Sequence, residues 1–342
     1  MFRDIDDARA VIRTIAVDEA DTPLSDGQQK LLLDRLIAQF WITPSDEPAR
    51  PGATRFGGAP DVPAAASWPM RPVPSELAKP EPDLDGYFKI DMKHFEWIAN
   101  HVVRKLPFEF LAQIDLQEAA KYPSAAHGLP DKGRLLFFWD GVVGTLKSGP
   151  EACHVLWDNA ETSSLIRLGV PQLLHELEAA YDPDGRHKKP YVWPERPMRL
   201  MPMVHLPHRS SADLVADAAL AAIADDKRFE ESYALLTAMD EGQFSADGRN
   251  ARRQRFMGSP DPEQDDPRFD AIVAGGFAPP PWKGAQLSDA ARAALDWQLL
   301  LQADLGDLSQ DRLTEGTVYF LIRRDDLTRR DFSRVHAIYQ QT

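Results

Sequence analysis

The sequence predicts an α+β fold built from two quasi-equivalent, largely antiparallel sheet units that arose by internal duplication. Three segments recur in the same order. RFGGAPD at 55–61 returns as RFMGSPD at 255–261, and FLAQIDL at 110–116 returns as LLLQADL at 299–305. GRLLFF at 133–138 returns as GTVYFL at 316–321. Because the three matches keep their order, we expect corresponding strands to be buried in corresponding surroundings.

The predicted organisation has added helices at the N-terminus and between the repeats. Residues 1–50 form an N-terminal helical segment, and residues 51–335 form one domain. Within this domain we expect repeat one over about 54–207, a helical insertion over about 208–241 and repeat two over about 242–335.

Local signals place the first elements. Periodic leucines after a Ser25 cap predict helical structure up to residue 42, and dense prolines at 44–82 predict a loop. An apolar stripe predicts a helix over 92–106, which Pro107 ends. Short apolar runs then predict strands, at 108–116, 133–140 and 152–157.

Later elements follow the same logic. Pro171 opens a helix that runs to Tyr181. Met198 to Leu206 is predicted to be another strand or an extended edge, because Pro202 would lie badly inside a central ladder. Two helices follow at 211–225 and 227–240, then a polar surface loop at 242–270, a short helix capped by Ser288, and strands at 299–303 and 317–323.

Composition bounds the class of protein. The 342 residues carry 39 Lys and Arg against 53 Asp and Glu, a net charge of -14, which disfavours nucleic acid and anionic membranes as partners. The same charge suits a basic protein partner, although acidity also serves solubility alone. The single Cys153 excludes an internal disulfide and a thiolate zinc cage, and with no apolar segment of signal or membrane-spanning type we expect a cytoplasmic protein.

The ordered motifs resemble the YwqG-like family of bacterial proteins. The resemblance starts at Arg55–Pro60 with Trp68, continues through Phe110–Leu116 and Gly258–Gln264, and reaches Asp331–Ser333, so it covers roughly residues 54–335. It implies an α+β fold with much antiparallel sheet. The family has no settled activity and no catalytic residues to carry over, but some members look like neutralising partners of bacterial toxins.

Two polar pairs are the first candidates for a ligand site. Side chains two apart on a strand share a face, so Gln113 points with Asp115, and Gln302 points with Asp304. If the two units face each other, these groups could converge and hold a cation or act as acid and base. The structural alternative is that each Gln clamps neighbouring backbone and each Asp caps a turn.

Arg55 and Arg255 stand at matching positions beside glycines, where a guanidinium and free amides could receive an anion. Alternatively, each arginine ties its loop to the aspartate six residues later. His205 and His208 have the spacing of metal ligands, but no further donors are signalled, so we expect surface histidines, no metal and no cofactor.

The candidate partner-binding residues lie in an acidic loop and a proline-rich loop. In the acidic loop these are Asp261, Glu263, Gln264 and Asp265, and in the proline-rich loop it is Trp193, a candidate exposed anchor. We therefore expect a protein-binding module of immunity-like type that neutralises a basic toxin. The alternatives are a small-molecule binder or an enzyme with a site between the repeats, although no hydrolase or dinucleotide motif is present, or a scaffold without a ligand.

Overall fold

The computed structural model describes residues 2–15, 23–48, 50–73, 92–181, 191–238, 254–309 and 315–341. Its strands are β1 (Ile37–Pro44), β2 (Arg55–Phe56), β3 (Asp61–Pro63), β4 (Glu109–Asp115), β5 (Arg134–Trp139), β6 (Cys153–Asp158), β7 (Leu165–Arg167), β8 (Arg196–His205), β9 (Arg255–Phe256), β10 (Trp297–Asp304), β11 (Thr317–Arg323) and β12 (His336–Gln340).

The helices of the described residues surround these strands. They are α1 (Ile5–Thr14), α2 (Asp26–Asp34), α3 (Met92–Val102), α4 (Leu116–Ala119), α5 (Gly141–Leu146), α6 (Gln172–Tyr181), α7 (Ala212–Ala216), α8 (Ala218–Ala224), α9 (Glu230–Ala238), α10 (Pro267–Ala274), α11 (Ala285–Ala294), α12 (Leu305–Ser309) and α13 (Arg324–Thr328), with 3-10 turns at Pro150–Ala152, Thr162–Ser164 and Phe332–Arg334.

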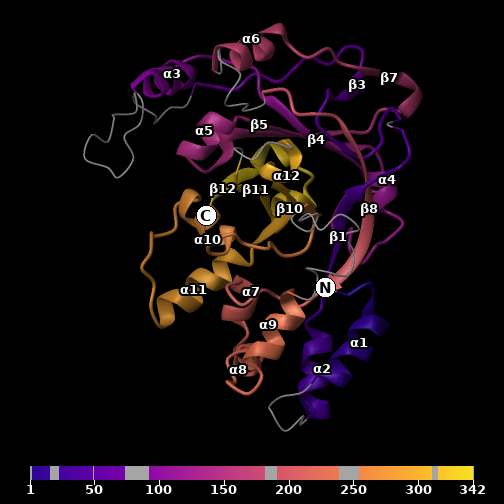
Figure 1. Cartoon of the computed structure of the whole chain (residues 1–342), viewed down its shortest axis with the longest axis vertical. Coiled ribbons are helices and arrows are strands. Elements are labelled where there is room, and N and C mark those ends of the chain that lie inside the picture. The colour runs from indigo at the N-terminus through magenta and orange to yellow at the C-terminus, as the bar shows by residue number, and fades with distance from the viewer. Residues whose placement is uncertain are drawn as a thin grey trace.

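A ten-stranded antiparallel sheet dominates the fold and curls nearly into a barrel (Figure 1). Its strand order is β12-β11-β10-β9-β1-β8-β2-β4-β5-β6, and β3 and β7 form a separate two-stranded sheet. The predicted mixture of helices with a mainly antiparallel sheet is confirmed.

Strand β1 occupies residues predicted to be helical. Residues 37–44 pair with β8 along their whole length, so the helix predicted to reach residue 42 is wrong at its end. Phe40, Trp41 and Ile42 are buried one after another. A continuous apolar run of this kind suits a strand covered on both faces as well as a buried helix, and periodicity alone cannot separate them.

Residues 196–205 form strand β8, so the predicted strand is confirmed, but it lies at the centre of the sheet and the alternative of a sheet edge is wrong. Pro202 is accommodated because β2 pairs with β8 only at Arg196 and Pro197 and Phe2 bridges to it only at Val204, so the ladder partner of Pro202 itself comes from β1.

The helix predictions need two further corrections. Residues 267–270, predicted to lie at the end of a surface loop, form the first half of α10, with Asp266 as its cap and Pro267 in its first turn. The predicted cap Ser288 lies inside α11, which begins at Ala285.

Particular ladder pairings recur on the two sides of the sheet centre. We call β8, β2, β4, β5 and β6 the first sheet half, and β1, β9, β10, β11 and β12 the second sheet half. In the first sheet half Arg55 pairs with Gln113, and in the second Arg255 pairs with Gln302. Each long hairpin also carries one irregularity at the same place, at Leu111 and at Leu300.

The interior of the curled sheet is filled with apolar side chains. Phe137 of β5 meets Phe320 of β11 edge to face, with ring centroids 5.2 Å apart. These two residues occupy matching positions, because Phe137 pairs with Ala112 and Phe320 pairs with Leu301. Contacts between facing halves therefore form the main core.

The two rims of the sheet approach each other at Gly149 and Ala337. Their backbones exchange two hydrogen bonds of 2.8 and 3.1 Å, and the Cys153 thiol lies 3.4 Å from the Val335 carbonyl oxygen. These contacts connect the start of β6 with the start of β12 and hold the sheet nearly closed.

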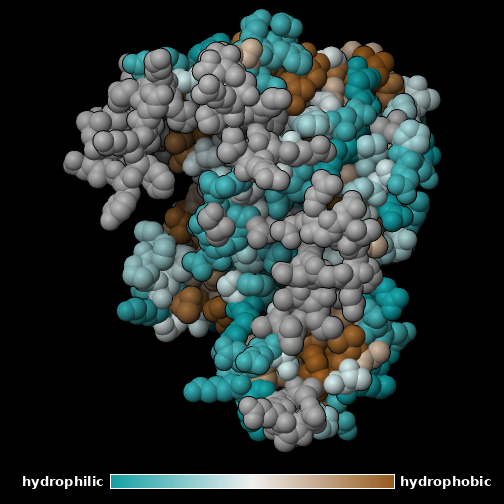
Figure 2. Space-filling model, in the orientation of Figure 1, coloured by the Kyte–Doolittle hydropathy of each residue, from teal (hydrophilic) through white to brown (hydrophobic). Residues whose placement is uncertain are grey.

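Separate layers cover the outside of the sheet. The β3–β7 pair and Trp68 cover Phe110 and Phe138, whereas α10 and α11 cover Leu299 and Tyr319. Helices α1, α2, α8 and α9 pack into a second core at one end of the molecule (Figure 1). Among the residues coloured in Figure 2, hydrophilic side chains predominate and apolar side chains gather in a few patches.

No helix within the described ranges is both long and apolar enough to cross a bilayer.

We expect the Cys153 thiol to be inert in the folded protein. Burial raises its pKa to about 12, so the reactive thiolate is scarce near neutral pH. At pH 8 a disulfide reagent such as DTNB should react with Cys153 only after urea unfolds the chain. Rapid reaction of the native protein would contradict the buried position of Cys153 in β6, next to Val335.

Candidate functional site

The predicted residues Arg55 and Gln113 meet in a buried polar network beneath β3. The Arg55 guanidinium lies 2.6 Å from the Asp61 carboxylate, and Arg167 binds the other oxygen of Asp61 at 2.6 Å. The Gln113 amide accepts the Asp61 N–H at 3.0 Å and donates to the Ala53 carbonyl at 2.9 Å. Arg55, Asp61 and Gln113 are each at most 1% exposed.

Electrostatics hold this first network in its charged form. Burial alone would raise the pKa of Asp61, but hydrogen bonds and charge from Arg167 and Arg55 outweigh it and lower the pKa. The Asp61 carboxylate also accepts the Gly52 N–H, at 2.8 Å, and so ties the loop that carries Gly52 to the sheet. The structure favours the structural alternative for Arg55 and Gln113.

The second network repeats these contacts with more exposure. Arg255 lies 2.8 Å from Asp261, and the Gln302 amide accepts the Asp261 N–H at 2.9 Å. Asp261 keeps 30% of its side chain exposed, whereas Asp61 keeps 2%. Gln302 itself is fully buried.

The two sets of predicted residues do not line one common cavity. Gln113 and Gln302 lie within their own networks, and apolar groups such as Phe137 and Phe320 fill the space between the facing halves. The convergence expected for Gln113, Asp115, Gln302 and Asp304 is therefore not found.

The predicted partner-binding residues are mostly engaged within the chain. Trp193 is 2% exposed and donates to Glu109 at 3.0 Å, so it is not an exposed anchor. Glu263 accepts the Thr317 hydroxyl at 2.7 Å, while Gln264 and Asp265 are exposed. The aromatic anchor was mispredicted because a proline-rich flank resembles a surface loop whether or not its tryptophan folds inward.

Asp115 is the predicted residue that reaches an open cavity. It lines two adjoining hollows of about 450 and 400 Å³, which also share Arg50 and Ala53. Its carboxylate caps α4 by accepting the Gln117 N–H at 2.9 Å, and burial raises its pKa. In the described part of the chain this carboxylate has no ion pair, which marks it as a candidate binding group.

The floor around Asp115 is held rigid. Its N–H donates to the Thr54 hydroxyl at 3.1 Å, and that hydroxyl donates to Glu118 at 2.7 Å. Glu118 also accepts the Leu200 N–H at 2.7 Å, so β2, β4 and β8 meet at one point. Asp304, the matching residue, caps α12 through the Asp307 N–H at 3.0 Å and lines neither hollow.

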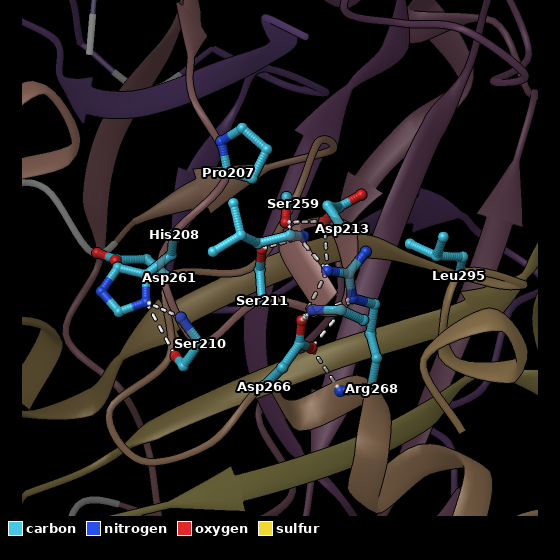
Figure 3. A network of polar contacts seen from close by, with 12 residues as sticks. Pro207, His208, Ser210, Ser211, Asp213, Ser259, Asp261, Asp266, Arg268 and Leu295 are labelled. Carbon is cyan, nitrogen blue, oxygen red and sulfur yellow. Dashed lines mark hydrogen bonds and ion pairs between the residues drawn. The ribbon is translucent and has the colours of Figure 1, made fainter. Parts of the chain in front are cut away.

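A third cavity, of about 310 Å³, lies where the two halves of the chain meet at the start of β1. Asp213, Ser259 and Arg268 line it, and Arg268 is bound by both Asp213 and Asp266 (Figure 3). Sequence reasoning missed this cluster because Asp266 and Arg268 stand in a stretch predicted to be surface loop. The sequence Asp266-Pro267-Arg268, typical of a helix start, is the signal that could have indicated a helix here.

The predicted surface histidines His205 and His208 are both at least partly buried. His205 is 5% exposed, so the predicted surface position is wrong, and burial with nearby Arg255 lowers its pKa to about 3. His208 is partly buried and bonds Ser210 at 2.9 Å. Within the described ranges, no three His, Cys, Asp or Glu side chains are grouped to hold a metal ion.

Comparison with known proteins gives a family but no activity. A family model described as a domain of unknown function (DUF1963) matches residues 54–340. No curated protein matches the chain.

The two arginine networks should differ in how much stability they contribute. Asp61→Asn leaves Arg55 buried without its charge partner and should lower the free energy of unfolding by about 3–5 kcal/mol. Asp261→Asn should cost clearly less, about 1 kcal/mol, because water reaches Asp261. Urea denaturation of both variants measures the difference, and equal losses would contradict it.

The Asp61 carboxylate also makes the free energy of unfolding depend on pH. Because the pKa of Asp61 is lowered on folding, its contribution is complete above the unfolded pKa of about 3.9 and declines as pH falls below it. The stability difference between wild type and Asp61→Asn should therefore shrink below about pH 4. Denaturant titrations between pH 3 and 7 would reveal a constant gap if the carboxylate were not involved.

Proposed function

The chain belongs to the family described as a domain of unknown function (DUF1963), so its role has to come from its own surface, and we propose a protein-binding module. The proposed site is the pair of hollows that meet at Asp115, and the proposed occupant is a segment of a basic protein. The observation that carries this proposal is that one partly buried carboxylate without an ion pair in the described part of the chain lies in the wall of both hollows.

The shape of the hollows favours an extended polypeptide. Arg50 and Ala53 belong to both linings, so the loop that carries them separates two adjacent depressions of similar volume. Side chains on one face of an extended peptide repeat every second residue, at roughly 6.5–7 Å. Such a peptide can place one side chain in each depression and its backbone across the loop.

Charged groups in the hollows suit a segment with donors. The first hollow is lined by four carboxylates and three cations, which are Asp46, Glu47, Asp115 and Glu118 with Arg50, Lys121 and Arg199. The second is lined by two carboxylates and three cations, which are Asp115 and Glu161 with Arg50, Lys132 and Arg134. The lining is therefore mixed in sign, and lysine or arginine side chains of a partner would be received at Asp115 and at the carboxylates beside it.

The overall charge supports a basic partner. A net charge of -14 attracts a cationic protein over a distance of about 8–10 Å at moderate salt and repels an anionic one. Within this proposal, an immunity-like protein that neutralises a basic toxin in the cytoplasm is the narrower version. Its support is this charge together with the resemblance to the YwqG-like family.

We also propose that the two sheet halves descend from one duplicated unit. The ladder partners Arg55–Gln113 and Arg255–Gln302 support it, as do the irregularities at the same place in both hairpins. A further support lies in the centre of the sheet. Phe40 pairs with Phe256 and Arg196 pairs with Phe56, so Phe40 and Arg196 hold corresponding positions. The same separation along the chain makes Thr43 correspond to Arg199, and Thr43 and Arg199 are ladder partners of each other.

Removal of the Asp115 charge tests the proposed site. Asp115→Asn should weaken binding of a labelled lysine-rich peptide about tenfold, because one charge-assisted contact of roughly 1.4 kcal/mol is lost. Fluorescence anisotropy at low and moderate salt measures the affinity, which should fall as salt rises.

Asp304→Asn is the matched control. It removes a helix-capping carboxylate at the corresponding position but outside both hollows, so it should leave the peptide affinity unchanged. Equal weakening by both variants, or binding that salt does not affect, would reject the site.

A further inference from the structure

The cavity at the junction of the two sheet halves shares no lining residue with the hollows at Asp115. Its walls come from the start of β1, the chain after α4, the turn before α10 and the start of β10. Six residues carry the argument: Ser124, Asp213, Met257, Arg268, Trp297 and Arg324. A volume of about 310 Å³ lies at the small end of ligand pockets, which fits a small molecule.

A buried ion network fixes one guanidinium in the wall of this cavity. Arg268 is 3% exposed and holds Asp266 at 2.6 Å through Nη2, with its Nε 3.0 Å from the other Asp266 oxygen. The same Nη2 contacts Asp213, and the Ser259 hydroxyl donates to Asp213 at 2.8 Å. Asp266 also receives the Ala212 N–H at 2.8 Å. The guanidinium plane is therefore set before any ligand arrives.

The network leaves one donor and one acceptor unused. Within the described part of the chain, Arg268 Nη1 and Asp213 Oδ1 have no hydrogen-bond partner, although their sister atoms are fully engaged. Figure 3 shows both atoms on the same side of the network, away from Asp266. Neither atom belongs to the fully buried, unpaired side-chain atoms of the described residues, so both reach the solvent of the cavity, where a polar ligand can pair with a donor and an acceptor side by side.

The rim adds a second cation and the walls add apolar surface. Arg324 donates Nε–H to the Leu295 carbonyl at 2.9 Å and forms no ion pair with any described residue. Trp297 and Met257 supply an aromatic and a thioether wall. Met257 has a φ of 62°, a left-handed conformation unusual for a side chain other than glycine, which the Leu300 carbonyl holds through a 3.1 Å bond from the Met257 N–H.

We infer that this cavity binds a small zwitterion of the α-amino-acid class with an apolar side chain. The ligand carboxylate lies between Arg268 Nη1 and Arg324, and the ligand ammonium donates to Asp213 Oδ1. The apolar side chain packs against Trp297 and Met257. This site goes beyond the proposed protein-binding function and does not depend on it.

Charge balance favours a zwitterion over a simple ion. The four charged groups, Arg268 and Arg324 with Asp213 and Asp266, sum to zero, so a ligand without net charge leaves the cavity neutral. Burial would raise the pKa of Asp213, but Arg268 outweighs it and lowers the pKa, so this carboxylate stays ionised and can only accept. A ligand group that donates with positive charge suits it best.

Calorimetric titration of the full chain tests the inference. The probes are free leucine and methionine, with N-acetyl-leucine, which lacks the ammonium, and leucinamide, which lacks the carboxylate. At least one of the two free amino acids should bind. If leucine binds, each blocked leucine should bind at least tenfold more weakly than leucine. If only methionine binds, neither blocked leucine should bind. No binding by either free amino acid, or equal binding of N-acetyl-leucine, would overturn the inference.

Two variants locate the binding without touching the buried network. Arg324→Gln removes the rim cation and should weaken binding about tenfold, and Ser124→Trp fills the exposed mouth and should abolish it. Arg334→Gln, an exposed arginine outside the cavity, is the control and should bind as wild type does. Unchanged affinity in both cavity variants would reject this location.

The outcome is independent of the hollows at Asp115. Asp115→Asn should retain wild-type amino-acid affinity, because Asp115 does not line this cavity. Loss of peptide binding alone and loss of amino-acid binding alone therefore report on two different sites.

Discussion

The backbone ladder between β1 and β8 is the interaction on which the rest of the sheet depends. It pairs eight residues of β1 with β8 and is the sole direct strand contact between the two sheet halves in the sheet order of the described residues. The other strands of this sheet add outward from the pair until the rims meet at Gly149 and Ala337. The curvature that brings Phe137 against Phe320 follows from this arrangement, because strand twist accumulates across a sheet of this width.

Buried charge in this molecule serves mainly to attach loops to strands. Asp61 binds Arg55 and the more exposed Arg167, Asp140 binds Arg71 and His101, and Asp266 binds Arg268, and the three carboxylates have little exposure. Each carboxylate also receives backbone N–H groups of a loop or a helix start. Charged residues that look like candidate active-site groups in the sequence are thus mostly structural, and the informative ones are those that line a cavity, as Asp115, Asp213 and Arg268 do.

The sequence predicted the outer strands well and the centre of the sheet poorly. The strands around Gln113 and Gln302 were predictable because breakers bound short apolar runs there. The predictions for β1 and β8 failed for different reasons. Phe40 in β1 lies in an apolar run without a distinctive period, whereas Pro202 in β8 is a residue typical of sheet edges. The burial of Trp193 and the cluster at Arg268 depend on contacts between distant segments, which local patterns do not encode.

The position of β1 has a consequence for where this domain can be cut. The family match starts at residue 54, yet β1 ends at residue 44 and lies between β8 and β9. A fragment trimmed to the matched region would lose a strand from the middle of its sheet and expose two unpaired edges, which promote aggregation. The smallest autonomous folding unit therefore extends upstream of the segment by which the family is recognised.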